Sequence, residues 1–305
     1  MSTPASPAWL AQKERGSALL MATLTRIALS LGRPAGAALL YPICAYFMVF
    51  AGPARAASRQ YLERVLGRAP TLSERFRHYH AFASTLLDRV FMHAGRLERF
   101  DCSLDGVDGL RDALAAGRGV LLVGAHLGSF EVLRAIAASE CPVPIRVLMH
   151  DGHARKMRRV MRKLDERLRA QVIPLGRPGT MLDVRDALGR GEIVALLADR
   201  SMHGERHVEC DFLGAPAAFP RGPFELAAML DVPVVLFSAV YRGACRYDIR
   251  FEPLPVTPTD GEPLRSPDAC CRAYASWLAE RCRAAPYNWF NFYDFWAQPG
   301  RVPRR

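Results

Sequence analysis

The sequence predicts an α/β protein with a largely parallel central sheet flanked by helices, preceded by an apolar helical segment. Residues 119–123 (GVLLV) form a short apolar run between glycines, which is typical of a strand buried on both faces of a parallel sheet. After residue 105, strand and helix patterns alternate, as in α/β folds. Residues 35–52, by contrast, are almost wholly apolar.

The composition excludes several classes of protein. With 305 residues, 50% of them apolar and 23% charged, the chain buries a substantial core in one large domain or two small ones. It is not a disordered, collagen-like or disulfide-framework sequence, and a polytopic membrane protein would be more apolar. Eight scattered cysteines without a CxxC pair indicate reduced thiols in a cytosol-facing protein.

The net charge of +11 favours anionic partners such as nucleic acid, lipid headgroups or acidic carrier proteins. The basic residues are spread along the chain, and no nucleic-acid-binding module is recognisable, so we expect no nucleic acid. Arginine supplies 38 of the 41 basic residues, which weakens any argument from arginine abundance alone.

The N-terminal segment carries no charge between Arg33 and Arg55, a stretch close to the ~20 residues that a membrane span needs. Pro42 interrupts it. Three interpretations remain open: a single span or re-entrant anchor, an interfacial helical hairpin, and a buried core helix. Basic residues flank both sides, more heavily on the C-terminal side. We therefore expect an inner-membrane protein whose C-terminal domain faces the cytoplasm.

We expect a membrane-associating segment over 1–57 and one domain over 58–305. Apolar periodicity, with glycine and proline as boundaries, predicts the elements in order. The expected helices are 58–100, 110–116, 129–138, 153–170, 181–188, 224–230 and 267–283. The expected strands are 119–123, 145–149, 171–175, 193–198, 232–241 and 247–254, with a loop over 200–222.

Three further features each have a structural and a functional interpretation. The helix at 153–170 is strongly basic on one side; it is a packing helix with a solvated face or a docking face for anionic headgroups or a carrier protein. His203, His207 and Cys210 lack a fourth ligand, so we expect an ordinary loop and no metal. The aromatic cluster at 289–296 indicates core or an interfacial anchor.

The residues best suited to chemistry lie in 124–131 (GAHLGSFE), where an apolar strand should pass into a helix. If His126 remains in the loop and a helix begins near Gly128, the imidazole can fold back toward Glu131. A carboxylate on one ring nitrogen fixes the tautomer and raises the basicity of the other nitrogen, giving a general base for a hydroxyl. The alternative is a capping Ser129 with an incidental histidine. Nucleophile elbows, P-loops, GxGxxG and HExxH are absent.

The sequence resembles the bacterial late acyltransferases of lipid A biosynthesis, in the lysophospholipid acyltransferase superfamily, over roughly residues 10–298. The resemblance rests on an ordered set of blocks: His126-x4-Glu131, Leu197-Ala198-Asp199 with His203-Gly204, Phe212–Pro223 leading into Leu226-Ala227, Pro233, and Pro286–Trp289. Residues 9–17 look like a divergent branch associated with aryl-polyene or polyketide-like lipids.

The resemblance implies a membrane-associated transfer of a fatty acyl chain from a thioester to a hydroxyl of a lipid or glycolipid, with no cofactor. It implies His126 as base and Glu131 as its orienter, acyl carrier protein as donor partner, and contact with an anionic membrane surface. Backbone amides at the helix start, Arg177 or Arg200 would stabilise the oxyanion. Asp199 would support the site, and Arg221 and Gly222 would shape a phosphate or acyl entrance.

Two other functions remain open. The same histidine in a thioesterase-like hydrolase would activate water instead of a hydroxyl, releasing free fatty acid. A basic membrane-binding protein without catalysis would bind in a salt-dependent way that ignores His126.

Overall fold

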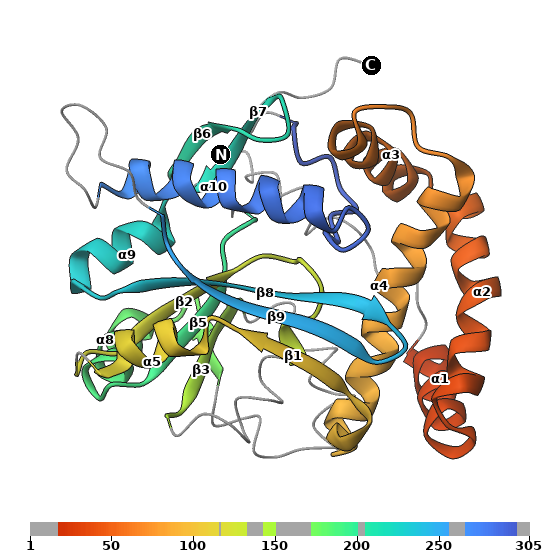
Figure 1. Cartoon of the computed structure of the whole chain (residues 1–305), viewed down its shortest axis with the longest axis horizontal. Helices are drawn as coiled ribbons and strands as arrows, with labels where there is room; N and C mark the ends of the chain where they lie inside the picture. The colour runs from red at the N-terminus through yellow and green to blue at the C-terminus, as the bar shows by residue number, and fades with distance from the viewer. Residues whose placement is uncertain are drawn as a thin grey trace.

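A seven-stranded sheet runs through the centre of the molecule, with helices on both faces (Figure 1). The computed structural model describes residues 18–115, 117–132, 143–150, 172–200, 205–255 and 266–297. The strand order is β1-β9-β8-β2-β5-β3-β4, and every pair is parallel except β8 with β9. The predicted fold class is confirmed. The strands are β1 (Asp101–Asp105), β2 (Val120–Gly124), β3 (Ile145–His150), β4 (Val172–Leu175), β5 (Ile193–Leu197), β8 (Val234–Gly243) and β9 (Arg246–Pro253).

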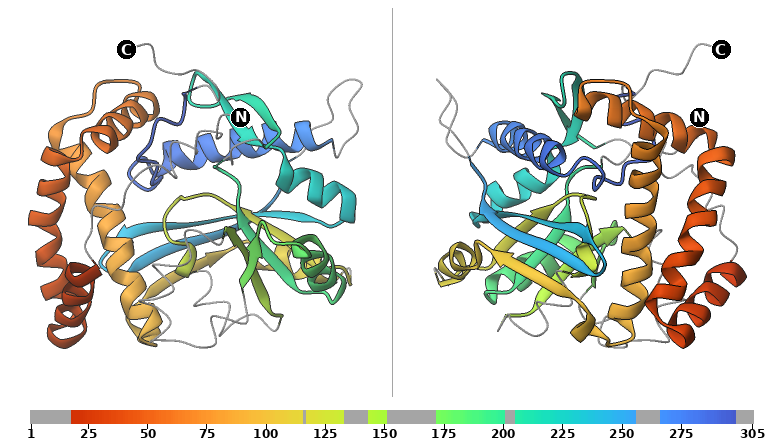
Figure 2. Two further views of the ribbon diagram at one scale, coloured as in Figure 1. Left: turned by 180° about the vertical axis from the view of Figure 1, so that it is seen from behind. Right: turned by 45° about the vertical axis from the view of Figure 1, so that its right-hand side comes forward.

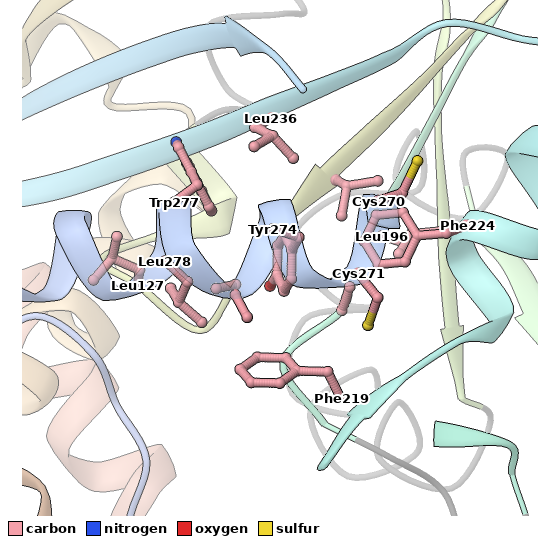
Figure 3. Close-up of a cluster of buried hydrophobic side chains, with 14 of the residues drawn as sticks. Leu127, Leu196, Phe219, Phe224, Leu236, Cys270, Cys271, Tyr274, Trp277 and Leu278 are labelled. Carbon is pink, nitrogen blue, oxygen red and sulfur yellow. The ribbon is translucent and has the colours of Figure 1, made fainter. Parts of the chain in front are cut away.

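Strand β2 is buried on both faces, which explains its unbroken apolar sequence. Leu121 and Val123 belong to the core shared with the helices α8 (Thr180–Gly189), α9 (Gly222–Leu230) and α10 (Pro267–Ala284). Figure 3 shows α10 packed in this core through Tyr274 and its neighbours. On the opposite face, Val120 and Leu122 pack in the core that includes α5 (Val107–Ala115).

Four N-terminal helices form a layer beside the sheet (Figure 2). They are α1 (Ala18–Leu31), α2 (Arg33–Phe50), α3 (Gly52–Leu66) and α4 (Leu72–His93), followed by the short 3₁₀ helix η1 (Leu97–Arg99). The predicted helical stretch 58–100 is thus divided. Gly67 ends α3 in the left-handed conformation, and a capping box of Thr71 and Glu74 starts α4. The expected boundary at residue 57 falls within α3.

Helix α2 is long and apolar enough to cross a membrane, and only 11% of its residues are buried inside the molecule. It packs along α4, where Tyr41 stacks on Phe76 at 5.8 Å between ring centroids. At its first residue, Arg33 donates to the fully buried Asp88 of α4 at 2.6 Å. The low burial argues against the buried-core-helix interpretation.

Two strand predictions need correction. The loop expected over 200–222 contains an antiparallel hairpin of β6 (His207–Asp211) and β7 (Pro216–Pro220), in which prolines stand at an edge. The edge strand β1 was not predicted, because its sequence DCSLD is polar and mostly exposed. The basic helix expected at 153–170 lies outside the described residues, as does most of the helix expected at 129–138.

Candidate active site

His126 lies two residues beyond the end of β2, in a sharp loop before a helix that begins at Phe130. Gly128 makes this loop possible, because its φ is +71° and a Cβ there would collide with the carbonyl oxygen of Ala239. The loop is anchored to its surroundings: the amide of Gly128 donates to the Asn288 carbonyl at 2.8 Å, and that of Ser129 to the Ala239 carbonyl at 2.9 Å. The histidine is therefore held at a fixed place at the edge of the sheet.

Asp199 is the carboxylate that contacts the imidazole. Its Oδ1 lies 2.8 Å from His126 Nδ1, and its Oδ2 accepts from the backbone amide of His126 at 2.9 Å. The strand register explains why Asp199 reaches His126: β2 and β5 are parallel neighbours in which Gly124 pairs with Leu197. Residues two positions beyond those strand ends therefore lie side by side.

The pair is arranged to give a neutral histidine beside an ionised aspartate. Burial, with the positive charge of Arg200, lowers the pKa of His126 below its usual value and outweighs the opposing effect of Asp199. Burial opposes ionisation of Asp199, but the contacts with His126 and the charge of Arg200 prevail and lower its pKa to about 2. With an ionised carboxylate on Nδ1, that nitrogen carries the ring proton.

The other ring nitrogen, Nε2, is left with its lone pair available. The His126 side chain remains 31% exposed, whereas Asp199 is only 1% exposed. Within the described ranges, the contacts of the His126 side chain all go through Nδ1, so Nε2 can meet a bound hydroxyl. This geometry is that of a general base oriented by a carboxylate.

Glu131 contacts different partners from those the sequence predicts. Its carboxylate lies 3.5 Å from Nε2 of His93 and 3.9 Å from Nε of Arg89, both on α4. The carboxylate that meets Nδ1 of the imidazole is thus Asp199 and not Glu131, and a role of Glu131 as orienter stays a prediction. Glu131 thus lies beside Arg89, whose positive charge lowers the pKa of His126.

Arg200 is the predicted arginine nearest to the pair. One of its terminal nitrogens donates to the Phe290 carbonyl at 3.2 Å, and its guanidinium lies 5.6 Å from the Tyr293 ring centroid. Arg177 follows β4, three strand positions from β2, which places it roughly 14 Å along the sheet edge.

The structure does not bring Arg221 and Gly222 together with His126. Arg221 precedes α9 and pairs with Asp268 of α10 at 2.5 Å and with Glu225 at 3.1 Å. Gly222 is the first residue of α9. These contacts join α9 to α10 and leave the predicted entrance role as an expectation.

The backbone amides of Gly128 and Ser129, two of the expected oxyanion donors, are already hydrogen-bonded within the protein. Of the two arginines expected for this role, Arg200 lies beside the pair. No group of three or more His, Cys, Asp or Glu side chains able to hold a metal occurs in the part of the chain that the structure describes; His203 is outside it.

Two residues near the pair were not singled out for the site from the sequence. Trp289 donates its indole N–H to Asp199 Oδ2 at 2.9 Å, and His78 of α4 lies 2.8 Å from the Trp289 carbonyl. Trp289 belongs to the predicted aromatic cluster at 289–296, and His78 falls within the helix expected over 58–100 without being a candidate of its own. The block Pro286–Trp289 marks Trp289 as part of the family resemblance but not its contact with Asp199, and no motif marks His78, since both contacts arise only through the tertiary fold.

The chain matches the profile of the bacterial lipid A biosynthesis acyltransferase family over residues 6–298. That match covers nearly the whole chain and includes β2, β5 and the segment after α10. No curated protein sequence matches it.

Proposed function

The chain belongs to the bacterial lipid A biosynthesis acyltransferase family, and from this premise we propose that it moves a fatty acyl chain from acyl carrier protein to a hydroxyl of a lipid or glycolipid. The observation that carries the mechanism is the contact of His126 Nδ1 with the buried Asp199, which leaves Nε2 without a contact among the described residues. A base of this kind suits a hydroxyl acceptor, and the reaction needs no cofactor.

In this mechanism, His126 Nε2 takes the proton from the acceptor hydroxyl as the oxygen attacks the thioester carbon. A C–O bond forms, and the carbonyl oxygen becomes an oxyanion that Arg200 stabilises. The C–S bond then breaks, and the leaving thiolate takes the proton back from His126. Asp199 accepts the hydrogen bond from Nδ1–H throughout, stays ionised, and stabilises the imidazolium that forms transiently.

Glu131 is proposed to act from the α4 side of the site. Its carboxylate balances the charge of Arg89, which would otherwise lower the basicity of His126 further. Loss of Glu131 is therefore expected to weaken the base as well as the packing of α4 against the catalytic loop.

Membrane association is proposed to use α2 and the start of α3. Tyr46, Val49 and Phe50 are all more than half exposed, an unusual surface for large apolar side chains in one place. A shallow hollow at the end of α2 is bordered by basic side chains that suit anionic headgroups: Arg55, Arg59 and Arg75. The positive-inside rule favours a catalytic domain on the cytoplasmic face of the inner membrane.

Vesicle flotation tests this membrane surface. Replacing Val49 and Phe50 together by serine should weaken binding to phosphatidylglycerol vesicles, because both side chains then lose favourable burial in lipid. Met229→Ser is the control, since Met229 is an even more exposed apolar side chain but lies on α9. Equal binding of the two variants would contradict the assignment of α2.

The function itself is tested by mass spectrometry of total lipid extracts from native-host cells carrying either the wild-type gene or His126→Ala. We expect a species heavier by one acyl group with the wild type alone, which would also identify the acceptor. His207→Ala, at an exposed strand start, is the matched control. Accumulation of free fatty acid instead would favour the hydrolase. Identical extracts, with the variant present at normal levels, would favour a binding role.

A further inference from the structure

The segment that follows α10, residues 286–292, contacts both members of the catalytic pair. The amide of Phe290 donates to the His126 carbonyl at 2.8 Å, and Trp289 pairs with Leu127 in an isolated antiparallel bridge. Trp289 is fully buried, and its indole N–H points to Asp199. The segment therefore fixes the backbone of the histidine loop and the side chain of its carboxylate together.

Asp199 has three hydrogen-bond donors around it. Oδ1 faces His126 Nδ1, while Oδ2 accepts from the His126 amide and from the Trp289 indole. The torsion χ2 of an aspartate is soft, and both donors from His126 belong to a single residue of the loop. The indole adds a donor from a rigid, buried ring, so it restrains the plane in which Oδ1 meets the imidazole.

Trp289 is itself held by a histidine from the N-terminal helices. His78 Nε2 lies 2.8 Å from the Trp289 carbonyl, and His78 Nδ1 lies 2.9 Å from Ser58 Oγ on α3. Burial lowers the pKa of His78 to about 4, so its ring is neutral. Because a carbonyl only accepts, Nε2 carries the proton, and Nδ1 accepts from the Ser58 hydroxyl.

We propose that Trp289, held by His78, is a positioning residue for acyl transfer that fixes Asp199 and thereby keeps His126 in the tautomer that acts as base. The inference rests on the proposed function. The contacts form a chain that runs from Ser58 through His78, Trp289 and Asp199 to His126. In this proposal the chain connects α3 and α4 to the catalytic pair.

The indole has an electrostatic effect that packing alone would not produce. A donor on Oδ2 draws negative charge away from the carboxylate and so reduces its stabilisation of a protonated His126. Removing the donor should raise the pKa of His126 and move the acidic limb of the rate profile to higher pH. The turnover should fall at the same time, because the ring is less well oriented.

The test compares Trp289→Phe with Trp296→Phe. Both indoles pack on Phe212 and Phe295, but Trp296 donates to the Phe212 carbonyl at 3.2 Å and not to Asp199. The purified full chain is assayed over a pH series with acyl carrier protein thioester and the acceptor identified in the cell extracts. His126→Ala is included in the same series.

We expect Trp289→Phe to lower kcat by about 10- to 100-fold with KM unchanged and to shift the acidic limb upward. We expect Trp296→Phe to lower only the Tm. A Trp289→Phe profile like that of the wild type, with His126→Ala inactive, overturns this inference and leaves the proposed function intact. Full activity of His126→Ala overturns the proposed function instead.

A second pair of variants avoids reliance on the folding of Trp289→Phe. His78→Gln keeps an N–H donor for the Trp289 carbonyl, whereas His78→Leu removes it. We expect near-normal kcat for the glutamine variant and a lowered kcat for the leucine variant. Equal kcat in the two variants would contradict the role of His78.

Discussion

Replacing Asp199 by asparagine changes the contact that orients His126 while leaving the side-chain shape almost unchanged. In the wild type, the ionised carboxylate accepts the Nδ1 proton across 2.8 Å. An asparagine amide can instead donate to Nδ1, which places the ring proton on Nε2, the nitrogen that must accept one from the substrate. The variant therefore favours the tautomer that cannot act as base.

The magnitude follows from what a positioned base contributes. General base catalysis is worth about 10²- to 10⁴-fold, so the rate of acyl transfer should fall by that factor, or roughly 3–5 kcal/mol in the barrier. The acidic limb should also move to lower pH, because Asp199 raises the pKa of His126 and asparagine does not. The loss of rate and the shift of the acidic limb therefore both report on the imidazole of His126.

Single-turnover transfer from acyl carrier protein thioester, followed by mass spectrometry over a pH series, measures both quantities. Asp248→Asn is the control, since it removes a carboxylate that pairs with Arg242 at 2.6 Å and accepts from Ser103 instead of contacting the imidazole. A wild-type rate for Asp199→Asn, with a folded protein by thermal melt, would refute the orienting role.

Three further outcomes follow from the same contacts. Arg200→Gln should shift the acidic limb of the rate profile to higher pH, because the charge of Arg200 lowers the pKa of His126; an unshifted limb would contradict this. Gly128→Ala should lower the Tm and the activity together, because alanine at φ +71° collides with the neighbouring strand, and a normal Tm would count against the loop geometry. Asp88→Ala should cost about 3–5 kcal/mol in denaturant unfolding, because it leaves Arg33 partly buried without its charge partner; a cost below about 1 kcal/mol would contradict this.

Much of the sheet could be predicted because several of its strands have a recognisable local sequence pattern. The runs that became β2 and β5 are short, apolar and bounded by glycine or a turn, so burial on both faces leaves a clear pattern. The hairpin β6–β7 left no such pattern, since most of its residues are polar, small or proline and its larger apolar residues, Val208 and Phe219, stand alone. The start of α4 could have been found from its capping box, Thr71 with Glu74.

Both His126 and Asp199 could be placed in the site from the sequence, but the role of orienting the imidazole was assigned to Glu131 and not to Asp199. His126 and Glu131 are close in sequence, which favoured pairing them, but Asp199 follows another strand. Only the adjacency of β2 and β5 brings it to the ring, and a single sequence does not reveal strand order. The contacts of Trp289 and His78 could not be predicted for the same reason, because each joins residues that are far apart in the sequence.

The most direct test of the account is single-turnover acyl transfer by purified wild type and His126→Ala, each supplied with the acyl carrier protein thioester and the acceptor from the cell extracts. Nε2 of His126 is the atom that we expect to take the hydroxyl proton, so the alanine variant should form no acylated product while keeping the wild-type Tm. Acyl transfer by the alanine variant at the wild-type rate would contradict the account.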